Sequence, residues 1–127
     1  DMLPFAYQVK STIAHSIGAI EGVRVGNFSP DLSPPPTSFA ELTEALDAAI
    51  AALKALDPAE IDGFIGRDMQ FSIRDTVMPF TAENFLLSFS QPNFYFHATT
   101  AYAILRNLGV KLGKLDFLGH MRLKVPA

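Results

Sequence analysis

The histidines are the side chains in this sequence that most directly suggest chemistry, because the chain contains no cysteine. An imidazole can bind a metal ion, act as a base or pack in a core. His97 lies inside the apolar and aromatic segment NFYFHATTAYAIL, residues 93–105, whereas His15 and His120 lie near the two ends of the chain. The residues that accompany these histidines decide between the three roles.

The spacing of the histidines does not favour a metal site. Two helical side chains share one ion when they are three or four residues apart. No histidine or carboxylate stands at these distances from His15, and the corresponding positions around His97 hold Asn93, Phe94, Thr100 and Ala101. We therefore expect no metal or other cofactor. The alternative is a divalent ion, zinc or nickel, bound by His15, His97 and one carboxylate.

A lone histidine on an apolar helix face is more often a hydrogen-bonded core residue than a ligand. The candidate partners for His97 in that case are Thr99, Thr100 and Tyr7. If His97 instead lines a pocket, the polar side chains near it predict a small-molecule site formed by Asn93, His97, Thr100 and Tyr7. The sequence leaves both interpretations open, and the catalytic residues of any enzyme stay unknown.

Composition restricts the class of protein. A chain of 127 residues suits a single domain, residues 1–127, and 49% hydrophobic residues can form a core. The net charge is -3 and no basic stripe is present, so we do not expect nucleic acid as a partner. The apolar runs are too short to span a membrane. No signal peptide is visible, which leaves the compartment open.

Hydrophobic periodicity predicts a mostly helical chain. We expect helices over residues 2–20, 38–57 and 82–108. Alternating apolar and polar residues over 67–73 predict a strand, and Val77–Phe80 predicts its partner in a small hairpin. Prolines punctuate this pattern: Pro79 predicts an edge strand, Pro92 a kink or break in the last helix, and Pro34–Pro36 an extended linker over 27–37.

Local signals predict where these elements begin and end. Ser38 and Glu41 form a capping-box pattern at the start of the second helix. Gly22 and Gly26 predict the end of the first helix, and Gly109 the end of the last. The tail after residue 109 is expected to pack back onto the helices through Leu115, Phe117 and Leu118.

The segment QPNFYFHATTAYAILRNLGVKLGKLDFLG, residues 91–119, resembles the C-terminal motif of the DUF1993 family, a family without an assigned function. DMLPFAYQV at the start, and SFAEL and LDPAEIDG further along, resemble other segments of that family, so the resemblance covers nearly the whole chain. It implies an all-α fold, a DinB/YfiT-like four-helix bundle with a small hairpin before the last long helix. Other branches of that superfamily bind a divalent metal through three histidines and include thiol-dependent transferases and isomerases.

The resemblance also implies that one helix is missing. DUF1993 members normally carry a helix of several turns before the segment that begins this sequence, so we expect truncation or processing. Three helices alone would leave a long apolar groove exposed, which soluble monomers avoid. We therefore expect a homodimer, or a complementing N-terminal helix fragment, to cover the groove.

Three hypotheses for function follow. The first is a metal-free binding or interaction module with a small-molecule pocket near His97. The second is a degenerate DinB-type metal-dependent enzyme, a transferase or hydrolase, that uses His97 and His15. The third is a structural or secreted protein that acts through its oligomer interface. Whether the chain is an enzyme is left open.

Overall fold

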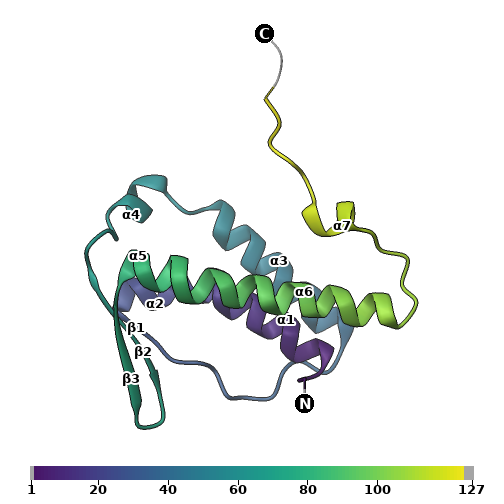
Figure 1. The fold of residues 1–127 in the computed structure, drawn as a ribbon, viewed down its shortest axis with the longest axis horizontal. Helices are drawn as coiled ribbons and strands as arrows, with labels where there is room; N and C mark the ends of the chain where they lie inside the picture. Colours follow the sequence, from purple (N-terminus) through teal and green to yellow (C-terminus); the bar gives the residue numbers. More distant parts are fainter. Residues whose placement is uncertain (1, 125–127) are drawn as a thin grey trace.

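The computed structural model describes residues 2–124, which are mostly helical and carry one three-stranded sheet (Figure 1). Two segments, η1 and η2, are π-helical and continue the α-helices beside them. In chain order the elements are α1 (Phe5–Ile13), η1 (Ala14–Gly18), α2 (Ala19–Val25), β1 (Asn27–Phe28), α3 (Phe39–Lys54), α4 (Pro58–Asp62), β2 (Asp68–Ile73), β3 (Thr76–Thr81), α5 (Ala82–Asn84), η2 (Phe85–Ser90), α6 (Gln91–Asn107) and α7 (Lys114–Leu118).

The three long helical segments share α1 as their centre. Helix α1 packs against both α3 and α6, whereas α3 and α6 share few contacts with each other. The hairpin formed by β2 and β3 lies at one end of this helical layer and α7 lies toward the other end (Figure 1). No helix within residues 2–124 has the length and hydropathy that crossing a membrane requires.

The first helix is longer than predicted, and Gly22 does not end it. The helical path runs through η1 and α2 to Val25, and Gly26, with a φ of 77°, ends it. Gly22 lies inside α2, where a Cβ atom would stand 3.0 Å from the Cβ of Phe28. Glycine at this position therefore lets strand β1 lie directly against the helix.

Part of the predicted linker is a strand. Asn27 and Phe28 form β1, which pairs in parallel with Gln70 and Phe71 of β2. A strand of two residues has no periodicity of its own, so its pairing partner defines it. The proline-rich segment after β1, residues 30–36, contains no helix or strand, as predicted.

The predicted hairpin is confirmed. Strands β2 and β3 pair antiparallel from Asp68–Thr81 to Ile73–Thr76, and Arg74 occupies the turn with a φ of 50°. Strand β3, which contains Pro79, is an edge of the β1-β2-β3 sheet, where the missing N–H costs no sheet hydrogen bond.

Pro92 does not break the last helix. Helix α6 begins at Gln91, so Pro92 stands in its first turn, directly after the π-helical segment η2. Where the sequence predicted a kink or a break, the structure has a change from the π-helical η2 to the α-helical α6. At the start of α3 the capping box of Ser38 and Glu41 is confirmed, with Glu41 N–H 3.2 Å from Ser38 Oγ and Ser38 N–H 3.0 Å from Glu41 Oε2.

The core lies where the sheet meets α2 and η2. It consists of buried residues from these elements and from the segment before β2: Ala19, Val23, Phe28, Phe64, Met69, Phe71, Ala82 and Phe85. By contrast, α6 contains no fully buried residue. The tail packs back only in part: the ring centroid of Phe117 lies 5.6 Å from that of Tyr102, but Phe117, Leu115 and Leu118 are all exposed. The helical layer is therefore well packed at its sheet end and open elsewhere.

Candidate functional site

His97 of α6 is bonded to a buried glutamine of α1. Its Nδ1 lies 2.7 Å from Oε1 of Gln8, whose side chain is completely buried. The amide nitrogen of Gln8 donates to the backbone carbonyl of Leu3 at 2.8 Å, so the amide oxygen is the atom that faces His97. An amide oxygen only accepts, and His97 therefore carries its proton on Nδ1. Its Nε2 is left as an acceptor.

The proton of His15 is placed by the same kind of reasoning. The hydroxyl of Ser90, a buried residue of η2, donates its single proton to the backbone carbonyl of His15 at 3.1 Å. The hydroxyl oxygen can then only accept from His15 Nδ1, which lies 3.4 Å away. His15 thus also carries its proton on Nδ1 and has Nε2 as an acceptor.

The two imidazoles form a pair between η1 and α6. Their planes are parallel within 8° and their ring centroids are 5.9 Å apart. Within residues 2–124 neither Nε2 has a hydrogen-bond partner. No buried side-chain nitrogen or oxygen in that range lacks a partner, so both Nε2 atoms must retain accessible surface. The pair therefore offers two acceptors to a molecule from outside.

Burial keeps both imidazoles neutral. Desolvation, and secondarily the neighbouring His97, lowers the pKa of His15 from its ordinary 6.5 to about 4. Desolvation also lowers the pKa of His97. A neutral imidazole with a bonded Nδ1–H presents a lone pair at Nε2, which can accept a hydrogen bond, take up a proton or bind a metal ion.

A small, partly open cavity of about 60 Å³ lies beside the pair. Tyr7, Ser11 and His15 line it from one face of the first helix, because they are four residues apart. Ser11 is 8% exposed, and no protein group within residues 2–124 bonds its hydroxyl. The remaining lining residues are Lys10, Ala14, Phe28, Pro30, Asp31 and His97.

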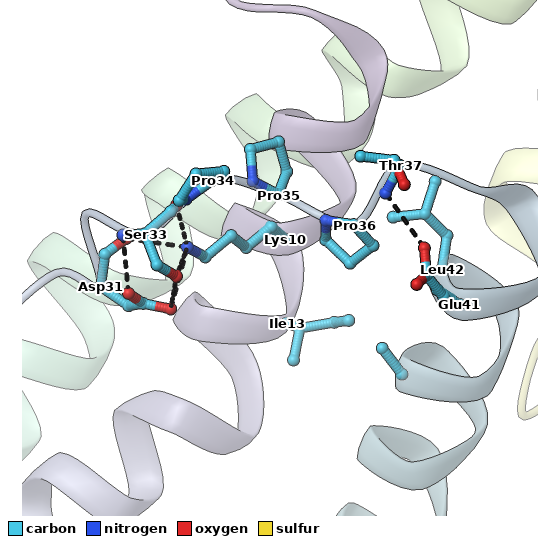
Figure 2. Close-up of a pocket in the computed structure, with 11 residues that line it drawn as sticks. Lys10, Ile13, Asp31, Ser33, Pro34, Pro35, Pro36, Thr37, Glu41 and Leu42 are labelled. Atoms are coloured by element: carbon cyan, nitrogen blue, oxygen red, sulfur yellow. Dashed lines mark hydrogen bonds and ion pairs between the residues drawn. The ribbon is translucent and has the colours of Figure 1, made fainter.

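The proline-rich segment Pro30–Pro36, called the strap below, is tied to α1 by one lysine (Figure 2). The ammonium of Lys10 lies 2.9 Å from Asp31 Oδ2, 2.6 Å from the carbonyl oxygen of Ser33 and 2.9 Å from Ser33 Oγ. This hydrogen bonding lowers the pKa of Asp31 to about 2, with Ser33 adding to the effect. Lys10 and Asp31 thereby close one side of the cavity.

A larger, open pocket of about 560 Å³ lies between α1, the strap and the start of α3 (Figure 2). Ile13, Leu42 and the three consecutive prolines supply its apolar walls. Its charged residues are already bonded: Lys10 to the strap, and Glu41 to Thr37 and Ser38 of the capping box. Because these charged side chains are used within the protein, whereas both histidine Nε2 atoms have no protein partner within residues 2–124, the cavity beside the histidines is the better candidate site.

The structure brings together only part of the site that the sequence predicted. Tyr7 and His97 line the cavity, with ring centroids 6.1 Å apart. Asn93 and Thr100 are not among its lining residues, because their side chains donate to the carbonyl oxygens of Phe89 and Phe96, one helical turn earlier. The hydrogen-bond partner of His97 is Gln8, and neither Tyr7 nor Thr99 nor Thr100 has this role.

Sequence reasoning missed Gln8, Ser11 and Ser90. The signal for Gln8 and Ser11 was weak, since the same helix also carries the polar residues Lys10 and Thr12. Ser90 had no such signal. Its role depends on the contact between η1 and η2, which brings Ser90 next to His15 although the two residues are 75 positions apart in the sequence.

The residues around the histidine pair do not supply the three-ligand site of a DinB-type metal centre. Two imidazole Nε2 atoms are present, and each Nδ1 has the kind of bonded partner that metal-binding histidines use. Within residues 2–124, however, no three His, Asp or Glu side chains form a group that could hold a metal. Asp31 is the carboxylate of the cavity lining, and it is paired with Lys10.

A second feature is an apolar groove between α3 and α6, called the α3–α6 groove below. Two hollows of about 340 and 270 Å³ lie along it. Its walls include Leu46 and Leu53 of α3 and Phe94, Ala98 and Leu105 of α6, and the first helix forms its floor. Phe94, Ala98 and Leu105, which recur at helical spacing along α6, therefore face this groove.

Comparison with known proteins agrees with the resemblance seen in the sequence. The family model of DUF1993, a domain of unknown function, matches residues 1–118. A crystal structure of a DinB family member protein from Shewanella denitrificans is 28% identical in sequence and superposes with a TM-score of 0.74, covering 99% of this chain and 71% of that one. No curated protein matches the sequence. Because the family model spans nearly all of the 127 residues, this chain belongs to the DUF1993 family.

Proposed function

We propose that this chain is a binding module that works without a metal and takes a small polar ligand in the cavity beside His15 and His97. The observation that carries the proposal is the fixed proton position of both imidazoles. Each Nδ1–H is used inside the protein, by Gln8 Oε1 and Ser90 Oγ, and each Nε2 is left without a protein partner. If the two histidines served packing alone, their Nε2 atoms would not need to stay without a partner beside the unbonded hydroxyl of Ser11.

The test is a titration with small polar compounds, namely methylammonium, methanol, acetate and formamide. Proton–nitrogen correlation spectra of the imidazoles report on each histidine separately. We expect at least one compound to shift the Nε2 signals of His15 and His97. His120 is exposed and lies outside the cavity, so its signals are the internal control. Unchanged His15 and His97 signals with all four compounds would refute the proposal.

The alternative for the same two histidines is a DinB-type metal-dependent enzyme, a transferase or hydrolase. It requires a third ligand, which Asp31 can become only by leaving Lys10. Zinc chloride or nickel chloride is therefore a separate arm of the titration. Stoichiometric binding of either ion with loss of the His15 and His97 signals, and no response to the organic compounds, would favour the enzyme.

A second candidate function is assembly through the α3–α6 groove. We infer that this groove is the position of a fourth helix, so that the fold is a DinB-like bundle with one helix position open. The exposure of large apolar side chains supports this: Leu53 and Tyr95, which line the groove, are 37% and 53% exposed, and Ile50, one helical turn after the groove residue Leu46 on α3, is 47% exposed. Contiguous apolar surface of this kind is typical of interaction sites. The occupant we propose is a second copy of the chain.

Sedimentation velocity tests the assembly. We expect the wild type to be a dimer and Ile50→Glu to be a monomer. Val77→Glu is the matched control, because Val77 is 56% exposed but lies on β3, away from the groove. A wild-type monomer at all concentrations would exclude the homodimer. A monomer that binds a synthetic amphipathic helix would show that a separate helix fills the groove.

A further inference from the structure

At least three unused acceptor atoms belong to the residues that line the cavity beside His15 and His97. Two are the Nε2 atoms of the histidines, whose protons lie on Nδ1. The third is Oγ of Ser11, a residue that is 8% exposed; this atom has no protein partner within residues 2–124 and, like the two Nε2 atoms, retains accessible surface. A ligand that covers these atoms removes them from water, which is costly unless the ligand gives them a hydrogen bond. A ligand that fills this cavity must therefore bring hydrogen-bond donors.

The charges around the cavity disfavour an anion. Lys10 is the cation of the lining, and its ammonium has three protons. Asp31 and Ser33 take these protons through the carboxylate, the Ser33 carbonyl and the Ser33 hydroxyl. The two imidazoles are neutral, so they offer lone pairs and not positive charge. An acetate or phosphate group would meet no free cation here.

We propose that the cavity binds the protonated head group of a primary amine, an inference that rests on the ligand-binding function proposed above. An alkylammonium group carries three N–H donors, which can serve Nε2 of His15, Nε2 of His97 and Oγ of Ser11. An alcohol would bring only one donor for these three atoms.

The walls and the size of the cavity agree with this class of ligand. The rings of Tyr7 and Phe28 line it, and aromatic faces attract ammonium groups. The carboxylate of Asp31 adds negative charge nearby. A volume of about 60 Å³ is well under half of the roughly 150 Å³ of an engineered cavity that holds benzene. It accommodates an aminomethyl group, with the rest of a larger amine outside.

Methylammonium chloride is the probe, and methanol and sodium acetate are the matched controls of similar size. We expect methylammonium to shift the imidazole signals of both His15 and His97 with a midpoint of about 10 mM or higher, because a ligand with two non-hydrogen atoms binds weakly. Methanol should bind at least about tenfold more weakly and acetate not at all, since a hydrogen bond to a charged donor is worth about a factor of ten or more.

Ser11→Ala tests the third acceptor. It removes the hydroxyl without breaking a bond within the protein, so we expect an unchanged melting temperature and methylammonium binding weakened at least about tenfold. Ser16→Ala is the control on the same helical segment. Its hydroxyl donates to the carbonyl of Ile13, and it does not line the cavity, so binding should be unchanged.

The outcomes separate the two proposals. Binding of acetate or methanol without methylammonium would overturn the amine inference and leave a polar-ligand site. No response to any compound would overturn both. If Ser11→Ala binds methylammonium as tightly as Ser16→Ala does, the amine is not held by the three acceptors and the inference is wrong.

Discussion

The imidazole of His97 and the amide of Gln8 meet between α6 and α1, with Nδ1 of the histidine 2.7 Å from Oε1 of the glutamine. Gln8 is completely buried, and its amide nitrogen is bonded to the carbonyl of Leu3. This hydrogen bond joins the helix that carries Tyr7, Ser11 and His15 to the helix that carries His97. The bond therefore holds α1 against α6 and also fixes the proton of His97 on Nδ1.

His97→Ala should lower the free energy of unfolding by about 1–3 kcal/mol, because the substitution leaves the buried oxygen of Gln8 without its donor and opens a cavity. Chemical denaturation measures the change. His120→Ala is the matched control and should leave stability unchanged, since His120 is exposed. An unfolding curve of His97→Ala that coincides with that of the wild type would show that the hydrogen bond does not stabilise the fold.

Stability should fall as the pH is lowered from about 6.5 toward 4. The unfolded chain takes up a proton at His15 near its ordinary pKa of 6.5, whereas the folded chain does so only near a pKa of about 4. Between these values the unfolded state binds more protons, so acid favours it. One histidine contributes at most about 1.4 kcal/mol per pH unit, and partial solvent exposure of the ring reduces this.

The measurement is the melting temperature as a function of pH for the wild type and for His15→Phe. Phenylalanine keeps an aromatic ring next to Phe28 and Phe89, which His15 contacts at 5.3 and 5.9 Å, but it does not titrate. We expect a shallower pH dependence in the variant. Equal slopes would mean that His15 is not the residue that destabilises the fold in acid.

Lys10→Met should release the strap from α1. Without the ammonium, the pKa of Asp31 should rise from about 2 toward its ordinary value, because the hydrogen bond from Lys10 is the main cause of the depression. Carbon-detected titration of the carboxylates measures this, and amide exchange at Leu32 and Ser33 should become faster. Lys54→Met is the control on α3 and should alter neither readout. An unchanged pKa of Asp31 in Lys10→Met would indicate that the contacts of Lys10 do not hold the strap against α1.

Gly22→Ala should destabilise the fold by about 1–3 kcal/mol. The new Cβ would lie 3.0 Å from the Cβ of Phe28 and 3.3 Å from the carbonyl oxygen of Asn27, so β1 would have to move away from α2. Gly18→Ala is the matched control, because its nearest neighbour would be 3.7 Å away. Alanine there should be tolerated or stabilise by up to about 1 kcal/mol through its higher helix propensity. Equal effects of the two substitutions would contradict the close approach.

The features that could be predicted from the sequence alone are local ones. The capping box at Ser38, the alternation over β2 and the position of Pro79 on an edge strand depend on residues that are close together in the chain. The motif around His97 also sufficed to indicate the family, because it is a contiguous run of residues.

The contacts of His97, by contrast, depend on how the helices pack together. Its partner Gln8 is 89 positions away, and the partner of His15 is 75 positions away, so neither pair has a signal in local spacing. The same holds for Gly22, which looks like a helix end in the sequence but is required by the approach of Phe28. Hydrogen-bond partners and close approaches depend on how helices dock, and docking depends on the whole packed surface rather than on neighbouring residues.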